Sequence, residues 1–238
     1  MATKMKNRIK DEIDANGEIV TTQKPKAEES QHIQIAPPNI QVVAFNVVGT
    51  SPLVQNKFSH KSRQKMHETH AAGSTDKKGK KRAPRDFRAD YEAAQHKSED
   101  GWNGIPAASF RASMISACRT AGFKMTHARQ TVFVLADGID GDDGTALVRI
   151  KGKPQYFESA VRNSTGVADL RARPMFREWS CVVRVEFDAD IFTVQDLANL
   201  LARAGIQVGV GEGRPGSKAS NGMGWGRFAI EIGGQPTS

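Results

Sequence analysis

The sequence has little cysteine and no long apolar runs. Among its 238 residues there are two cysteines, Cys118 and Cys181, and both lie within apolar runs. We therefore expect two buried thiols rather than a disulfide framework or a thiolate metal site, in an intracellular, cytoplasmic protein. No run of about 18 apolar residues exists, so neither a transmembrane span nor a membrane partner is expected.

The N-terminal region lacks both an apolar signal segment and a helical or strand pattern. Residues 1–38 are rich in Lys, Glu, Gln and Thr and end at Pro37-Pro38. A charged start without an apolar stretch excludes a secretory signal. This composition predicts a disordered N-terminal tail, with the folded domain in residues 39–238.

What the chain does have is positive charge concentrated in one segment. It contains 34 Lys and Arg against 26 Asp and Glu, a net charge of +8. The stretch from Lys57 to Arg88 holds eleven basic and three acidic residues, an excess that equals the whole net charge. The rest of the chain is therefore electrically balanced.

This basic stretch lies within residues 56–104, which are rich in Lys, Arg, His, Ser and Gly. Such a composition buries too little apolar area to offset an ordering cost of roughly 1–2 kcal/mol per residue. We expect a disordered insertion that binds nucleic acid; a nuclear-localisation or solubilising segment is the alternative. The predicted contacts are Lys57, Lys61, Arg63, Lys65, Lys77, Lys78, Lys80, Lys81, Arg82, Arg85 and Arg88.

The rest of the sequence alternates between strand and helix patterns. Alternating apolar residues predict strands over 41–48, 131–135, 146–150, 180–188 and 227–232. Helical spacing predicts one helix over 107–120 and a second from Thr193 to Gly205, where Thr193 and Asp196 form an imperfect capping box. The order β-α-β-β-α-β predicts an α+β fold with a ferredoxin-like (split βαβ, RRM-like) core. The basic insertion then lies between the first strand and the first helix.

Two patterns raise the question of a metal site. The acidic turn Asp137–Gly144 lacks the spacing of a calcium-binding EF-hand, so we expect a solvated turn. His60, His67 and His70 lie in a low-complexity region without a nearby cysteine, which disfavours zinc. We therefore predict no metal and no cofactor.

Residues 209–226 contain seven glycines in 18 positions. A dinucleotide-binding glycine motif follows a strand and opens a helix, whereas this loop follows a helix and opens a strand. Because glycine has no Cβ, a polymer can approach such a backbone closely and reach its N–H groups. The residues predicted to bind nucleic acid here are Gly211, Gly213, Arg214, Lys218, Gly224, Trp225 and Arg227.

The two glycine clusters, Gly-x-Gly-x-Gly-Arg and Gly-x-Gly-x-Gly-Arg-Phe before a final strand, resemble the glycine-rich loop of the RAMP (repeat-associated mysterious protein) superfamily. The segments Gly49-Thr-Ser-Pro-Leu53 and Ile105-Pro-Ala-Ala-Ser-Phe-Arg111 are also similar to such proteins. Glu212, inside the first cluster, departs from the pattern. The resemblance implies a ferredoxin-like RNA-recognition fold like that of CRISPR effector backbone subunits.

The resemblance further implies non-catalytic binding of single-stranded RNA, including guide RNA, by a homo-oligomer or by stacked copies within a ribonucleoprotein. Single-stranded DNA is the alternative ligand. A mobile basic arm supports either ligand independently, because it gains affinity through counterion release. With two Tyr and three Trp, the sheet offers few stacking residues, so we expect backbone reading without sequence preference.

Some arginines and tryptophans outside these segments have two interpretations. Arg111, Arg171 and Arg173 are predicted contacts to nucleic acid, but pairing of the latter two with nearby acidic residues is an equal interpretation. Trp225 is the expected stacking residue, whereas Trp179 is expected in the core.

Two other functions are kept as alternatives. Some RAMP relatives are ribonucleases that use a His base or a loop Asp, and the sequence offers His60, His127, Asp90 and Asp100. No spacing typical of a catalytic dyad or triad accompanies them, so we expect no catalytic residues. The other alternative is a self-assembling structural protein, including a viral one.

Overall fold

The computed structural model describes residues 35–57, 86–162, 168–217 and 223–232, with the backbone of short strands at 12–13, 19–20 and 235–236. The chain divides into two compact units, Met1–Pro37 and Pro38–Ser238. In the first unit, β1 (Glu12–Ile13) pairs antiparallel with β2 (Ile19–Val20). Apart from these two strands, residues 1–34 of the predicted N-terminal tail lie outside the described residues, as do residues 58–85 of the predicted insertion.

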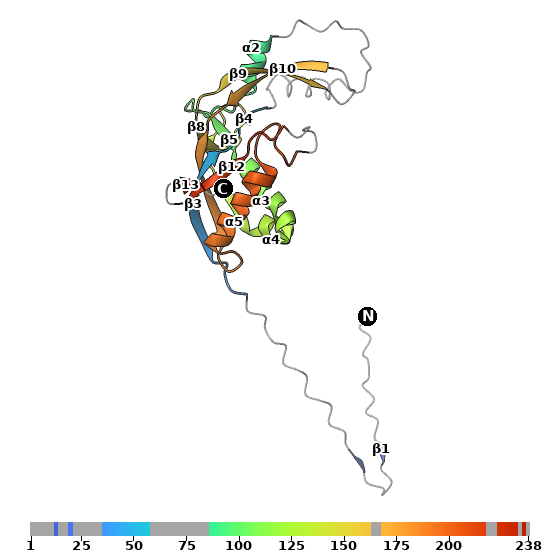
Figure 1. Cartoon of the computed structure of the whole chain (residues 1–238). Coiled ribbons are helices and arrows are strands. Elements are labelled where there is room, and N and C mark those ends of the chain that lie inside the picture. Colours follow the sequence, from blue (N-terminus) through green and yellow to red (C-terminus); the bar gives the residue numbers. More distant parts are fainter. Residues whose placement is uncertain are drawn as a thin grey trace, which may run out of the picture. The chain divides into compact units, whose positions relative to one another are not determined.

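The second unit is built on a curled antiparallel sheet, with helices packed on one face (Figure 1). In chain order its elements are β3 (Ile40–Gly49), β4 (Leu53–Val54), α2 (Phe87–Ala93), β5 (Gly104–Pro106), α3 (Ala107–Ala121), α4 (Met125–Thr131), β6 (Val132–Leu135), β7 (Gly138–Ile139), β8 (Ala146–Lys151), β9 (Gln155–Arg162), β10 (Ala168–Phe176), β11 (Ser180–Asp188), α5 (Val194–Arg203), a π-helical turn (Ala204–Val208), β12 (Phe228–Ile232) and β13 (Gln235–Pro236).

The centre of the main sheet is the pair β3 and β11, which are antiparallel along their whole length. β12 adds to the other edge of β3, and β6 pairs with the second half of β11. The four strands therefore follow the order β12-β3-β11-β6, and each neighbour is antiparallel. β8 joins the first residues of β11 and extends the sheet to β5 and β7. The predicted α+β class is confirmed.

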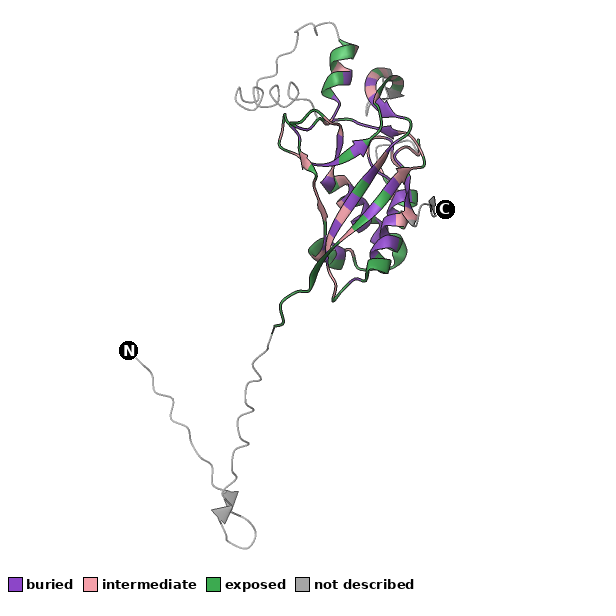
Figure 2. Ribbon diagram, turned by 90° about the vertical axis from the view of Figure 1, so that its left-hand side faces the viewer, coloured by how far each residue is buried: buried purple, intermediate pink, exposed green. Residues whose placement is uncertain are grey.

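One face of this sheet is buried and the other is open. Along β3 and β11, Phe45, Val47 and Val183 are at most 8% exposed, whereas Val42 is 55% and Val182 is 37% exposed. This alternation follows from the two-residue period of a strand. Figure 2 views the sheet from the side that no described helix covers. This face of the sheet is therefore accessible to solvent and to ligands.

The two longer helices cover the buried face and begin and end where the sequence predicts. On α3, Phe110 and Met114 are fully buried, and Gly122 ends the helix with φ +72°. On α5, the Thr193 side chain accepts from the Asp196 N–H, while the Asp196 carboxylate accepts from the Thr193 N–H, so the capping box is complete. Burial of each large apolar side chain contributes about 1.5–3 kcal/mol to folding.

A second sheet, in the order β4-β10-β9, stands beside the first and carries α2 (Figure 1). Asp86 caps α2 through the N–H groups of Arg88 and Ala89, and Tyr91 is buried against the ring of Tyr156. The prediction of disorder throughout 56–104 is therefore wrong for residues 86–104. The Asp86 cap and the aromatic contact to β9 stabilise this helix despite its polar composition.

Both cysteines are buried and unpaired, as the sequence predicts. Burial raises the pKa of the Cys181 thiol to about 12, so this thiol stays protonated and unreactive. Of the helices in the described part of the chain, none combines the length and the apolar character needed to cross a membrane.

Candidate nucleic-acid interface

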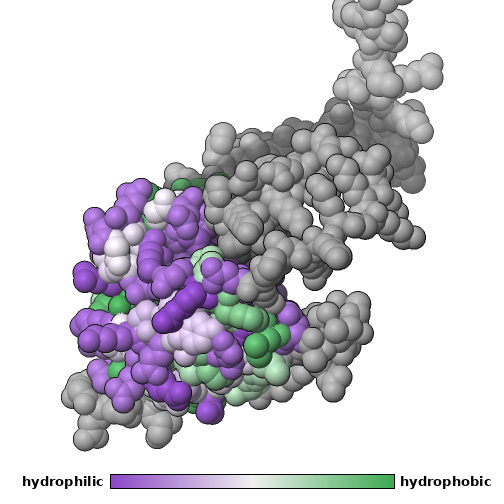
Figure 3. Space-filling model, turned by 90° about the horizontal axis from the view of Figure 1, so that it is seen from above, coloured by the Kyte–Doolittle hydropathy of each residue, from purple (hydrophilic) through white to green (hydrophobic). Residues whose placement is uncertain are grey.

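A cleft of about 690 Å³ lies between the glycine-rich loop, the β9–β10 hairpin and the start of α3. Its lining includes Arg171, Arg173, Arg214, Trp225 and His96. We call it the glycine-loop cleft. Its walls come from segments far apart in the sequence, so the tertiary fold alone creates it. From the end that carries α2 and the hairpin, the described surface is mostly hydrophilic (Figure 3).

The glycines of the loop are required by close backbone packing. Gly211 has φ +80°, and a Cβ there would lie 2.6 Å from the Val54 carbonyl oxygen. Gly213 has φ +74°, and a Cβ there would overlap the Trp225 ring. Residues with side chains rarely adopt this conformation and have no space here. The loop is therefore a folded wall of the cleft, held by bonds such as that from the Glu212 N–H to the Val54 carbonyl, 2.8 Å.

Glu212, the departure from the RAMP-like pattern, is the counterion of two arginines. Its carboxylate lies 2.7 Å from Arg173 Nε and 3.7 Å from an Arg171 terminal nitrogen. Arg171 also lies 3.4 Å from the Asp169 carboxylate. Arg171 therefore pairs with Asp169, as one interpretation of the sequence predicts. The main partner of the two arginines is, however, Glu212. Both arginines still line the cleft, so a phosphate entering it would share their donors with Glu212.

Arg214 and Trp225 form the loop side of the cleft. Arg214 donates to the Gly211 carbonyl, 3.1 Å, and forms no ion pair with a described residue. Trp225 is half-buried, and Phe157 of β9 packs edge-on to it with ring centroids 5.7 Å apart. Arg227 donates to the Gly224 carbonyl at 3.1 Å and does not line the cleft. The loop therefore supplies one available guanidinium and one indole.

The first turn of α3 forms another wall, at Pro106 and Ser109. Pro106 is the N-cap residue and makes no side-chain capping bond to the first-turn N–H groups. The N-terminus of a helix carries a partial positive charge. This wall therefore adds to the positive potential that the arginines create.

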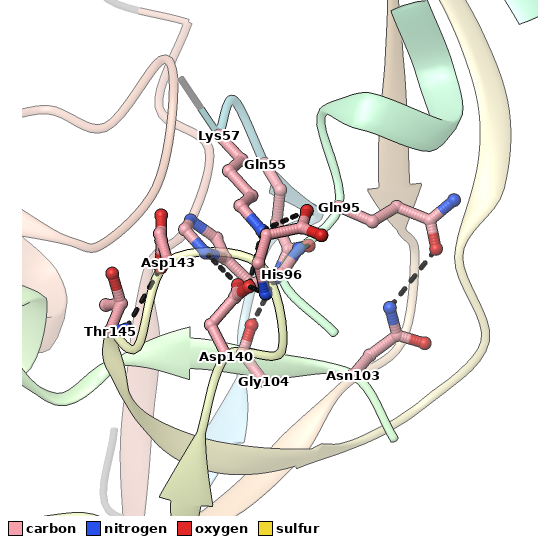
Figure 4. A network of polar contacts seen from close by, with 10 residues as sticks. Gln55, Lys57, Gln95, His96, Asn103, Gly104, Asp140, Asp143 and Thr145 are labelled. Carbon is pink, nitrogen blue, oxygen red and sulfur yellow. Dashed lines mark hydrogen bonds and ion pairs between the residues drawn. The ribbon is translucent and has the colours of Figure 1, made fainter. Parts of the chain in front are cut away.

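Lys57, a predicted phosphate contact, belongs instead to a buried ion-pair network beside the cleft (Figure 4). Its amine lies 2.5 Å from Asp140 and 2.8 Å from Asp142, and the Lys57 and Asp140 side chains are 2% and 0% exposed. Burial alone would lower the pKa of Lys57, but the two carboxylates outweigh it and raise this pKa. One prediction is therefore corrected, because Lys57 is not available to phosphates. The turn is exposed at Asp142, as predicted, but Asp140 within it is buried.

His96 lies on the cleft side of this network, and the sequence did not single it out. Its Nδ1 is 3.2 Å from Asp140, and its backbone N–H donates to the Gln55 side chain. Burial lowers the pKa of His96, although Asp140 opposes the shift, so the imidazole is neutral at pH 7. With Nδ1–H donating to Asp140, Nε2 is a free acceptor among the described residues. No spacing signals this pair, because 44 positions separate its members.

The other predicted residues lie elsewhere. Arg111 donates to the carbonyls of Val132 and Arg129 and stacks over Phe133, so it joins α3 to α4 and β6 and is corrected to a structural role. Arg88 lies over the Tyr156 ring, 5.1 Å from its centroid. The catalytic candidates His127, Asp90 and Asp100 do not line the cleft. Outside the described residues lie His60, Lys61, Arg63, Lys65, His67, His70, Lys77, Lys78, Lys80, Lys81, Arg82, Arg85 and Lys218.

No protein-family model matches the chain, and no curated protein is similar to it. Within the residues that the structure describes, no three His, Cys, Asp or Glu side chains gather in a way that could hold a metal ion.

Proposed function

We propose that the chain binds single-stranded nucleic acid in the glycine-loop cleft. The observation that carries this proposal is the convergence of Arg171, Arg173 and Arg214 with the Trp225 indole in one cleft. Guanidinium groups bind phosphate oxygens through paired hydrogen bonds, and an indole stacks on a base of any sequence. These are the two contacts that single-strand binding requires.

Glu212 makes the cleft selective for a polymer over a small anion. It lies 2.7 Å from Arg173, so a ligand must displace this carboxylate before it can use all the donors of the guanidinium. An isolated phosphate would have to replace this carboxylate without further gain. A strand adds base stacking on Trp225 and a contact to Arg214, so it can compete with Glu212.

The strand order supports the proposed family relationship. A ferredoxin-like core places its four antiparallel strands in the spatial order 4-1-3-2 and its two helices on one face. The order β12-β3-β11-β6, with α3 leading from β3 to β6 and α5 from β11 to β12, agrees with this arrangement. We therefore propose a ferredoxin-like, RAMP-type domain that prefers RNA and serves as a repeating subunit of a ribonucleoprotein, such as a CRISPR-effector-like assembly.

The direct test is binding of a fluorescent oligouridylate, followed by anisotropy, against an oligothymidylate of equal length. We expect saturable binding of both strands, tighter for RNA, and weaker as salt rises. An Arg214→Gln variant should bind less tightly than Arg119→Gln, which removes the same charge from an exposed position on α3. Equal binding by the two variants would contradict a role for the cleft.

Cleavage of the bound RNA is a second candidate function, favoured by the His96–Asp140 pair at the cleft. Neutral His96 could accept the proton of a ribose 2′-hydroxyl at Nε2 while Asp140 orients the ring. The 2′-oxygen would then form a bond to the adjacent phosphorus as the bond to the 5′-oxygen breaks. The 5′-oxygen takes a proton from solvent, and the other product is a 2′,3′-cyclic phosphate.

This candidate is tested by incubating labelled RNA with the protein in the presence of a chelator. Slow, metal-independent cleavage is expected, with cyclic-phosphate ends, and a His96→Gln variant should bind RNA but not cut it. A strand that lacks 2′-hydroxyls should stay whole. RNA that remains intact with the wild-type protein would leave binding as the only function of the cleft.

A further inference from the structure

A second groove, of about 760 Å³, lies where the ends of β3 and β8 meet the start of β9 and the turn between β10 and β11. We call it the basic groove. Its lining holds three cationic side chains, Lys151, Lys153 and Arg177, all exposed. Glu178 is the only acidic residue in this lining. The groove therefore carries a net positive charge.

None of these three cations forms an ion pair with a described residue. Arg177 Nε donates to the neutral side-chain amide of Gln155, 2.9 Å, and its charge stays uncompensated. The amines of Lys151 and Lys153 have no hydrogen-bond partner among the described residues. This separates the groove from the cleft, where Arg171 and Arg173 share the carboxylate of Glu212.

The floor of the groove is backbone rather than side chain. Gly152 has φ +147°, and a Cβ there would lie 2.6 Å from the Glu178 carbonyl oxygen. A Cβ on Gly49 would overlap the indole of Trp179. That indole itself lines the groove, is 3% exposed and donates to the Ser51 carbonyl, 2.9 Å. Close packing at the groove therefore requires glycine at both positions.

Figure 2 views the face of the sheet that no described helix covers, and residues of the groove lie on this face. Lys151 pairs with Ser180, and Ser180 pairs with Val48, so these three residues form one row across β8, β11 and β3. Cross-strand partners share a face. Val47 is fully buried, so its neighbour Val48 and the rest of the row point to the open side. Lys151 is therefore accessible from the open face of the sheet.

We propose that the basic groove binds the phosphodiester backbone of a single-stranded nucleic acid, as a second contact separate from the glycine-loop cleft. This inference rests on the proposed function of the cleft. The groove offers no exposed aromatic ring for stacking, because Trp179, the one aromatic residue of its lining, is 3% exposed. Its cations are exposed and hydrated, so a strand that releases several counterions at once gains more than a single phosphate does.

The test compares two triple variants that remove the same charge. Lys151→Gln, Lys153→Gln and Arg177→Gln together empty the groove of cations. The matched control, Lys124→Gln, Arg129→Gln and Arg203→Gln, removes exposed cations from the helical side. Binding of a long fluorescent oligouridylate is measured over a range of KCl concentrations. For the groove variant, we expect the slope of log K against log salt to fall by about 2, since each phosphate contact on a single strand contributes about 0.7.

The outcomes separate this inference from the proposed function. A wild-type protein that does not bind the strand overturns both. If the wild type binds and Trp225→Ala weakens binding, but the groove and control variants keep equal slopes, only the groove is overturned. A loss of slope confined to the groove variant, with unchanged thermal unfolding, supports it.

Discussion

The glycine-loop cleft and the basic groove each contain cationic side chains, but only in the cleft are any of these cations paired with a carboxylate of a described residue. In the cleft, Arg171 and Arg173 are held by Glu212, and Arg173 is half-buried. In the groove, Lys151 and Arg177 are exposed and have no ion pair with a described residue. A cation that is paired with a carboxylate has little net charge, so it attracts a phosphate only at short range. An unpaired cation attracts phosphates over one Debye length, about 10 Å at moderate salt. The two sites should therefore differ in salt dependence.

The buried network beside the cleft is the extreme case of a paired cation. Replacing Lys57 by Gln leaves Asp140 buried without its counterion, which should reduce the free energy of unfolding by about 3–5 kcal/mol in urea titrations. Because the pKa of Lys57 is raised above 10.5, this contribution is present at neutral pH and is lost only as pH rises above that value.

Lys97→Gln is the matched control for this prediction. Lys97 pairs with Glu92 at 3.0 Å, but both side chains are about half exposed, so the change should cost less than about 1 kcal/mol. Similar losses for the two variants would contradict the assignment of Lys57 to a buried pair.

Trp225 tests whether the cleft binds bases as well as phosphates. Truncating it to Ala should weaken binding of oligouridylate by about 1–3 kcal/mol, because each stacked base contributes that much. Trp225→Phe should retain much of the affinity, since it keeps an aromatic face. Unchanged affinity of the Ala variant, with intact folding by circular dichroism, would rule out stacking in the cleft.

His96 gives the cleft side of the molecule a pH dependence that the groove lacks. Its pKa is lowered by burial, with Asp140 and Asp143 opposing and Lys57 adding to the shift. The unfolded chain therefore binds a proton that the native state does not, and the free energy of unfolding decreases as pH falls below about 6.5. The slope should be at most about 1.4 kcal/mol per pH unit.

Urea titrations at several pH values measure this slope. His96→Gln should flatten the pH dependence in this range, because it removes the group whose pKa is lowered by burial. Equal slopes in the wild type and the His96 variant would show that the imidazole is not buried against Asp140.

Glu212→Gln should have the smallest effect and the opposite sign. Releasing Arg173 from its carboxylate should tighten binding of oligouridylate and increase the salt slope by about 0.7, the contribution of one ionic contact. Glu178→Gln, in the basic groove, removes the same charge. Glu178 forms no ion pair with an arginine among the described residues, so this variant releases none. An equal gain from both variants would mean that Glu212 acts only through net charge.

Much of the second unit could be predicted from local patterns. The strands over β3 and β11, the helix α3 with its stop at Gly122 and the cap of α5 at Thr193 lie where the sequence indicates. These features depend on residues within a few positions of one another. By contrast, α2 lies in a polar segment, and its contact with β9 links residues more than 60 positions apart.

The candidate site was predicted only in part. Arg171, Arg173, Arg214 and Trp225 were all singled out from the sequence, and the fold brings them to one cleft. His96 was missed, because nothing in its own segment identifies Asp140 as its partner. Lys57 stands at the start of a basic run and was grouped with it, although its environment is set by a turn 83 positions away.

The sequence by itself indicated the strands β3, β6, β8, β11 and β12, the longer helices, the balanced charge of the body and the residue types available for binding, but not β9 and β10 of the hairpin. Those properties follow from local periodicity and composition, which each segment carries wherever it is placed. Only the tertiary structure decided which cations are paired, which are buried and which converge. Charge compensation acts through space between distant segments, so Lys57, Arg173 and Lys151 differ in role although each is only a basic residue in the sequence.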